Sequence, residues 1–182
     1  IDEYTFSGCS NMRRISIPNS VTKIGAYAFA TCRILEQITI PASITEISEG
    51  AFYSAFENKY CLQIPNGVTK IGVNAFYNCG NFESINIPES VTEIGYNAFH
   101  DCCPLQSLEI PDNVSFQYSG LYLVIDDKRY RVLNSKEVAI FSNVNSTKTP
   151  KTVTFDGKQY NIITLSPKEY DKFRAMEPMI RF

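Results

Sequence analysis

The stretch Ile87-Pro88-Glu89-Ser90-Val91-Thr92-Glu93-Ile94-Gly95-Tyr96-Asn97-Ala98-Phe99 decides the fold, because versions of it fill the first two thirds of the chain. The Ile-Pro pair that opens this stretch recurs at regular intervals. Its prolines are Pro18, Pro41, Pro65, Pro88 and Pro111. Subtracting successive positions gives spacings of 23, 24, 23 and 23 residues. A fixed period of this length predicts a solenoid, in which one supersecondary unit is stacked on the next.

The spacings inside one unit predict how its chain runs. Ile85 and Ile87 are two residues apart, so a single strand can point both toward the core while the residues between and before them point outward. Val91 and Ile94 are three apart, and a flat strand cannot direct both to one side, so we expect a turn or bulge between them. Gly95 is expected where the backbone turns again. The rings of successive units are expected to stack as an inward spine of Phe29, Phe52, Phe76 and Phe99.

Most units also carry a large apolar residue three positions before the first isoleucine: Met12, Leu35, Phe82 and Leu105. The resulting L-x-x-I-x-I run resembles the strand segment of leucine-rich repeats. Its continuation, I-P-x-S-V-T-x-I-G-x-x-A-F-x-x-C, closely resembles the BspA-like branch of that family, the bacterial surface leucine-rich repeat proteins. The resemblance covers about residues 1–115. It implies a curved, right-handed solenoid of short parallel strands that is displayed outside the cell and often used for adhesion to host or matrix proteins.

The repeat pattern decays after Pro111, which predicts two parts. Residues 1–115 are expected to form the leucine-rich repeat solenoid, of about five coils, and this part starts in the middle of a repeat. Residues 116–182 are expected to form a β-rich segment of hairpins and a degenerate repeat, with a short helix over residues 167–177. Asp156-Gly157 lies between two alternating runs, which is a strong signal for a two-residue hairpin turn.

Composition limits the partners. The 182 residues carry a net charge of −2 and 44% hydrophobic residues, which is typical of a folded chain with a substantial core. The near-neutral balance argues against nucleic acid or an anionic membrane as the main partner. No apolar run approaches the ~20 residues of a transmembrane helix, so we expect no direct membrane insertion. Separately, we expect the chain to be a monomer. An extracellular or cell-surface location would need a targeting signal upstream of residue 1.

The six cysteines are interpreted from their position in the repeat. Four of them share one repeat position with Ala55, namely Cys9, Cys32, Cys79 and Cys102. Such a column suits small buried residues whose side chains point the same way, which is poor disulfide geometry, so we expect thiols. Cys61 falls outside the column and is expected to be the exposed thiol. Zinc is not expected, because the chain has no C-x-x-C pair and His100 is its only histidine.

The chain carries no motif of a common catalytic site. It has no G-x-S-x-G, H-E-x-x-H, P-loop or G-x-G-x-x-G. His100 follows Phe99 in the repeat and is expected at the surface. Asp126-Asp127 is better explained by a turn than by a cation site. We therefore expect no catalytic residues, no metal, no cofactor and no enzymatic activity.

One outward column alternates in charge along the repeats: Lys23, Glu46, Lys70 and Glu93. Neighbouring coils ~4.8 Å apart would place these charges in a ladder. A slip of one repeat would set like charges together, so the ladder is interpreted as a control of register.

One unit has 24 residues, and its extra residue lies within residues 55–60. Lys59 stands there at the place of the usual large apolar residue. We expect a local bulge, while the alternative is a loop adapted to a ligand. In either case Tyr60 is a plausible exposed contact.

The outward strand positions form the candidate site. They are small and polar, and plain solvation explains them as well as recognition does. The candidate ligand-binding residues are Arg14, Gln37, Thr39, Tyr60, Gln63, Ser84, Asn86, Ser107 and Glu109. The predicted function is a non-catalytic cell-surface interaction or adhesion module that binds an extracellular protein or glycan through this strand face. The alternatives are a structural spacer within a longer surface protein and a glycan-binding accessory domain.

Overall fold

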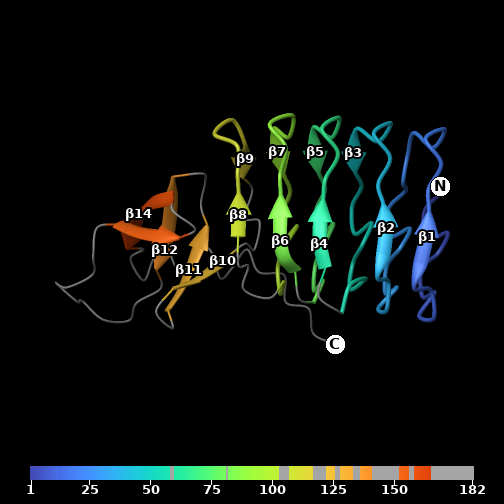
Figure 1. The fold of residues 1–182 in the computed structure, drawn as a ribbon, viewed down its shortest axis with the longest axis horizontal. Coiled ribbons are helices and arrows are strands. Elements are labelled where there is room, and N and C mark those ends of the chain that lie inside the picture. Colours follow the sequence, from blue (N-terminus) through green and yellow to red (C-terminus); the bar gives the residue numbers. More distant parts are fainter. Residues whose placement is uncertain are drawn as a thin grey trace.

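The computed structural model describes residues 1–57, 60–80, 82–102, 107–116, 122–125, 128–132, 136–140, 152–155 and 158–164. Its repeats form a stack of coils, and the strands of successive coils lie side by side (Figure 1). The first strand row consists of β1 (Arg14–Ser16), β2 (Gln37–Thr39), β4 (Tyr60–Gln63), β6 (Phe82–Asn86) and β8 (Ser107–Glu109). The second strand row consists of β3 (Glu46–Ile47), β5 (Lys70–Ile71), β7 (Glu93–Ile94) and β9 (Ser115–Phe116).

Both rows are built from parallel pairs in register, as the period predicts. In the first row β1 pairs with β2, and β6 lies between β4 and β8, so hydrogen bonding divides this row into two sheets. The second row is one continuous four-stranded sheet in the order β3-β5-β7-β9. The stack of coils with short parallel strands that the period predicts is therefore present.

Within a coil, burial follows the predicted spacings. Ile85 and Ile87 are 2% and 3% exposed, whereas Asn86 between them is exposed. The N–H of Val91 donates to the carbonyl of Pro88 at 3.0 Å, which turns the chain after the strand. Val91 and Ile94 are consequently both fully buried, as predicted from their three-residue separation.

The phenylalanine spine is confirmed. Successive rings are stacked with their centroids 5.4, 5.3 and 5.4 Å apart, from Phe29 through Phe52 and Phe76 to Phe99. All four rings are fully buried. Offset or stacked aromatic pairs contribute beyond their buried area, so the spine ties each coil to its neighbours.

The chain turns again at Gly95, as expected, because the N–H of Ala98 donates to the carbonyl of Gly95 at 3.2 Å. The left-handed backbone of the turn falls two residues later, at Asn97, whose φ is 53°. Gly95 is instead a point of close approach, because a Cβ there would lie 2.7 Å from the backbone nitrogen of Val73 in the preceding coil. Where Ser48 replaces this glycine, its Oγ donates to the carbonyl of Ile24 at 2.6 Å.

The cysteine column lies where the sequence predicts, and its thiols bond to the preceding coils. The Sγ atoms of Cys32, Cys79 and Cys102 donate to phenylalanine carbonyls at 3.2, 2.8 and 3.1 Å. The five described cysteines, Cys9, Cys32, Cys61, Cys79 and Cys102, are thiols rather than half-cystines, and Cys61 is exposed. The sixth, Cys103, lies outside the described residues.

Burial raises the pKa of the Cys79 thiol to about 12, against the three backbone hydrogen bonds that lower it. The unfolded chain loses this proton near pH 9, so between pH 9 and 12 the unfolded state binds fewer protons than the folded state. The contribution of the neutral Cys79 thiol to stability is complete below pH 9 and is lost as the pH rises toward 12. In this pH range we expect the free energy of unfolding to fall more steeply with pH for the wild type than for Cys79→Ala. The two slopes should differ by up to ~1.4 kcal/mol per pH unit.

This comparison is made by urea unfolding at a series of pH values. The fold accepts alanine in this column, since Ala55 occupies the same position one coil earlier. Alanine at position 79 also leaves every tyrosine in place, so the difference between the two proteins isolates the thiol. Identical slopes for both proteins would show that Cys79 is not held as a buried neutral thiol.

The 24-residue coil accommodates its extra residue in a way that the sequence did not predict. Phe56 folds into the core, where it is fully buried and lies 5.7 Å from the ring of Phe52 and 5.9 Å from that of Phe82. It thereby supplies the large apolar side chain that this unit lacks at its usual position. The pairing of β4 with β6 shifts between Tyr60 and Cys61, so the predicted bulge is confirmed.

The C-terminal sheet contains β10 (Tyr122–Ile125), β11 (Lys128–Val132), β12 (Glu137–Ile140), β13 (Thr152–Phe155) and β14 (Lys158–Thr164). Its order is β10-β11-β12-β14-β13, with the predicted antiparallel hairpins and one parallel pair, β12 with β14, that was not predicted. Tyr160 is fully buried in the same apolar cluster as the coils. The helix predicted over residues 167–177 lies outside the described residues.

Candidate interaction surface

The first strand row brings the predicted site residues onto adjacent strands. Register pairing sets Arg14 beside Gln37 in β1 and β2, and Gln63 beside Asn86 in β4 and β6. These four side chains are exposed. Outward alternation along each strand therefore does place these residue types on one surface.

The remaining predicted residues differ in what the structure says of them. Thr39 is exposed and Ser84 is half-buried. Tyr60, Ser107 and Glu109 are placed by their backbones in β4 and β8, where Ser107 pairs with Ser84 and Glu109 with Asn86. Because β2 and β4 belong to different sheets, Arg14 and Gln37 lie on one sheet and the residues from Tyr60 onward lie on the other.

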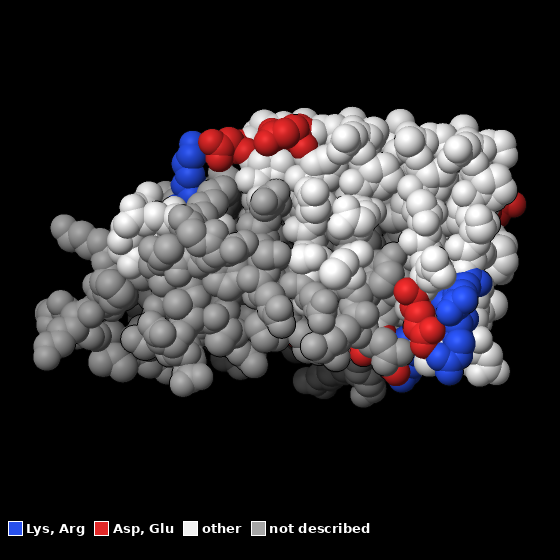
Figure 2. Space-filling view, viewed as in Figure 1, with Lys and Arg blue, Asp and Glu red and all other residues white. Residues whose placement is uncertain are grey.

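Around the first strand row, charge lies mainly at the rim. Arg13 and Glu36 form an ion pair between neighbouring coils, and Arg33 and Glu57 form another at 3.2 Å. In Figure 2 the coloured side chains lie at the edges of the view, and the described middle of the stack is uncharged. Among the described side chains, the first strand row therefore offers hydroxyl and amide groups together with the thiol of Cys61 and the guanidinium of Arg14.

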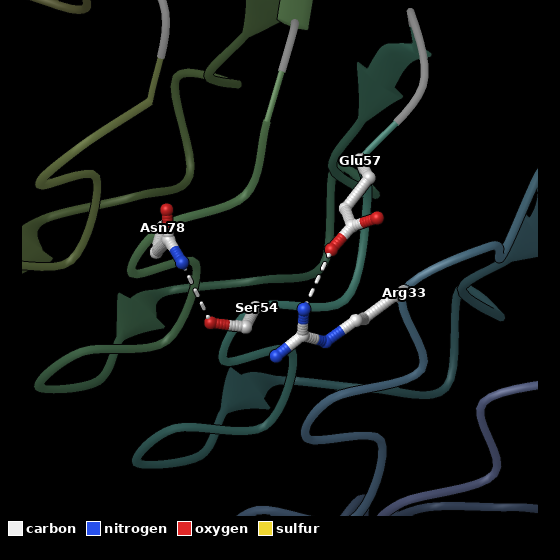
Figure 3. A network of polar contacts seen from close by, with 4 residues as sticks. All are labelled: Arg33, Ser54, Glu57 and Asn78. Carbon is white, nitrogen blue, oxygen red and sulfur yellow. Dashed lines mark hydrogen bonds and ion pairs between the residues drawn. The ribbon is translucent and has the colours of Figure 1, made fainter.

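A polar network joins successive coils at one corner (Figure 3). The Nδ2 of Asn78 donates to the Oγ of Ser54 at 3.0 Å, and the Nη1 of Arg33 donates to Glu57. Ser54 and Asn78 occupy the same repeat position, and both have a left-handed backbone with φ of 52° and 51°. Short polar side chains favour this conformation, so the network supports the turn.

A second aromatic ladder runs beside this corner, and sequence reasoning missed it. The rings of Tyr53, Tyr77 and His100 are stacked at 4.9 and 5.2 Å. His100 is therefore half-buried in a ladder rather than simply on the surface, and its Nδ1 lies 3.1 Å from Oδ2 of Asp101. Burial, followed by the charge of Asp101, raises the pKa of Tyr53, which keeps its phenol neutral.

Tyr27 shows why one coil needs a glycine in its turn. A Cβ at Gly50 would lie 2.3 Å from the Tyr27 ring, so that ring occupies the space left by the missing side chain. The Tyr27 hydroxyl donates to Oε1 of Glu49 at 3.0 Å. Burial, followed by Glu49, raises the pKa of Tyr27.

Cys102 follows His100 and Asp101 in sequence, but its thiol points inward to the carbonyl of Phe76. Across the part of the chain that the structure describes, no group of three or more His, Cys, Asp or Glu could hold a metal ion. Asp126-Asp127 lies outside that part. No helix within the described residues is long and apolar enough to cross a membrane.

Residues 1–123 and 55–158 match the model of a family described as BspA type leucine rich repeat region, in six copies. A leucine rich repeat protein of T. pallidum is 34% identical, with a TM-score of 0.58 over 63% of this chain and 53% of that chain. A leucine rich cell surface protein of Faecalibacterium prausnitzii A2-165 is 35% identical, with a TM-score of 0.57 over 66% of this chain and 30% of that chain. The chain thus spans less than two thirds of either relative. No curated protein matches it in sequence.

Proposed function

The chain belongs to the BspA type leucine rich repeat family, and from this premise we propose that it is a non-catalytic interaction module displayed at the cell surface. A right-handed solenoid, closed by the β-rich segment of residues 116–182, would hold an extracellular macromolecule against the first strand row. The observation that carries the proposal is the row itself, where exposed hydrogen-bonding side chains lie in register on neighbouring parallel strands. The surface location is supported by the name of the relative from F. prausnitzii.

The proposed mode of binding follows from the shape and composition of this surface. Its described side chains are small, and Tyr4 is the only large hydrophobic residue among the described ones that is exposed. Little apolar area is therefore available for burial, so affinity is expected to depend on a few anchors and on repetition over several coils. Arg14 at one end and Tyr60 in β4 are the anchors that we propose, since Arg and Tyr are enriched among energetically dominant interface residues.

We expect Arg14→Ala/Tyr60→Ala to weaken binding at least about tenfold, because truncating an anchor residue typically costs more than 1 kcal/mol. The measurement is surface plasmon resonance against immobilised matrix proteins, mucins and neutral glycans. Tyr122→Ala/Tyr130→Ala in the C-terminal sheet serves as the control and should bind like the wild type. Loss of binding in the control alone would move the site to that sheet. A wild type that binds nothing on the panel would favour a spacer.

A further inference from the structure

A line of alternating charge runs over four successive coils, through β3, β5 and β7 of the second strand row and the equivalent repeat position of the coil before β3. Its members are Lys23, Glu46, Lys70 and Glu93, and register pairing places Glu46 beside Lys70 and Lys70 beside Glu93. Exposed threonines lie next to this line on the same coils, at positions 22, 45, 69 and 92. The hydroxyls of Thr69 and Thr92 donate to the carbonyls of Thr45 and Thr69, which holds these side chains along the stack.

Among the described residues, ion pairing within the chain uses two of these four charges. Lys70 Nζ lies 3.6 Å from Oε2 of Glu93. Among the described residues, the side chains of Lys23 and Glu46 form no ion pair, although Glu46 lies between two coils that each carry a lysine. Two of the four charges in the line therefore have no ion-pair partner among the residues that the structure describes.

The order of the line has a geometric property. Read in reverse, the order Lys, Glu, Lys, Glu becomes Glu, Lys, Glu, Lys. An identical line that runs in the opposite direction therefore places a glutamate opposite every lysine. We propose that the second strand row is a contact between two copies of this chain, related by a twofold axis that runs parallel to the strands between β3 and β5. In this arrangement Lys23 faces Glu93 of the second copy, and Glu46 faces Lys70 of the second copy.

The same pattern excludes other alignments and other partners. Two lines running in the same direction and in register place lysine on lysine, and an antiparallel line shifted by one coil places like charges together. Other shifts that restore opposite charges leave at most three facing pairs, so the unshifted antiparallel alignment, with four, is the most favourable. A polyanion or a polycation meets as many repulsive as attractive charges along the line. A matching partner must alternate positive and negative charges at the spacing of the coils, and a second copy of this chain does so. This inference replaces the monomer expected from the sequence and is independent of the proposed ligand.

The contact is weak and electrostatic, because Lys70 and Glu93 are about 40% exposed, at 42% and 39%. Its dissociation constant therefore depends on salt. The dimer uses no residue of the first strand row, so two such rows remain open and one pair of chains can bind a repetitive partner at two places.

The test uses two variants of the whole chain, Glu46→Lys/Glu93→Lys and Lys23→Glu/Lys70→Glu, which carry four lysines or four glutamates in the line. Analytical ultracentrifugation should find each variant monomeric alone and an equimolar mixture dimeric. For the wild type we expect a dissociation constant at least about tenfold higher in ~0.5 M salt than in ~0.02 M salt. A mixture that stays monomeric, or a wild-type dimer indifferent to salt, would overturn the proposal.

Further variants keep the test decisive if a line of like charges impairs folding. The milder Glu46→Gln/Lys70→Gln removes the central contacts without repulsion and should raise the dissociation constant about tenfold. Exchanging all four charges restores alternation and should restore the wild-type dimer. Thermal unfolding followed by circular dichroism confirms that each variant is folded. An exchanged protein that no longer dimerises, or a Gln variant that dimerises as before, would place the contact elsewhere or exclude it.

Discussion

Ile94→Asp is expected to unfold the repeat stack at temperatures where the wild type is stable. Ile94 is fully buried in β7, where it pairs in register with Ile71 and Phe116. A carboxylate at this position would have to lose its water without gaining a charged partner, at a cost of several kcal/mol, on the order of the whole stability of a small domain. Urea unfolding followed by circular dichroism measures the effect.

Thr92→Asp is the matched control for this substitution, since Thr92 is exposed two residues earlier on the same coil. It should change the free energy of unfolding by about 1 kcal/mol or less, because the new charge remains in water. Equal midpoints for Ile94→Asp and the wild type would show that Ile94 does not face the core and that the assigned repeat register is wrong.

Phe76→Ala is expected to destabilise the protein by about 3–5 kcal/mol, the usual cost of removing a buried aromatic ring. Phe76 stacks on Phe52 at 5.3 Å and on Phe99 at 5.4 Å, and it meets Phe82 edge to face at 6.2 Å. Its removal leaves a cavity in the middle of the stack, where neighbouring coils cannot close around it.

Phe6→Ala tests the same spine one coil before Phe29. Phe6 is partly buried and stacks on Phe29 at 5.2 Å. The free energy of unfolding should therefore fall clearly less than for Phe76→Ala. Equal losses of unfolding free energy in urea for Phe6→Ala and Phe76→Ala would show that stacking on both faces does not add to the stability of the central rings.

Much of the fold could be predicted because each coil repeats the same spacings. The two-residue and three-residue separations determine which side chains can share a face, and the 23-residue period brings equivalent residues into register. Phe56 shows where this reasoning ends. Phe56 is buried because of the backbone path of the one coil that has an extra residue. Alignment of the repeats instead places the large apolar side chain of this coil at position 59.

For the candidate surface, alternation predicted which residues point outward, and those whose side chains are described do so. The division of the first strand row between β2 and β4 was not predictable, because hydrogen bonding across a bulge depends on backbone path. The second aromatic ladder did leave a signal. Tyr53, Tyr77 and His100 are spaced by 24 and 23 residues, the same spacings as the prolines, and three ring-bearing residues in register predict stacking.

The central claim is that recognition belongs to the first strand row. It is tested most directly by comparing the dissociation constants of two matched amide variants for the panel molecule that the wild type binds. Gln63→Ala/Asn86→Ala alters the row, and Gln159→Ala/Asn161→Ala removes the same groups from exposed positions of β14. We expect the first variant to bind at least about tenfold more weakly and the second within about twofold of the wild type. Equal affinities for the two variants would contradict the account.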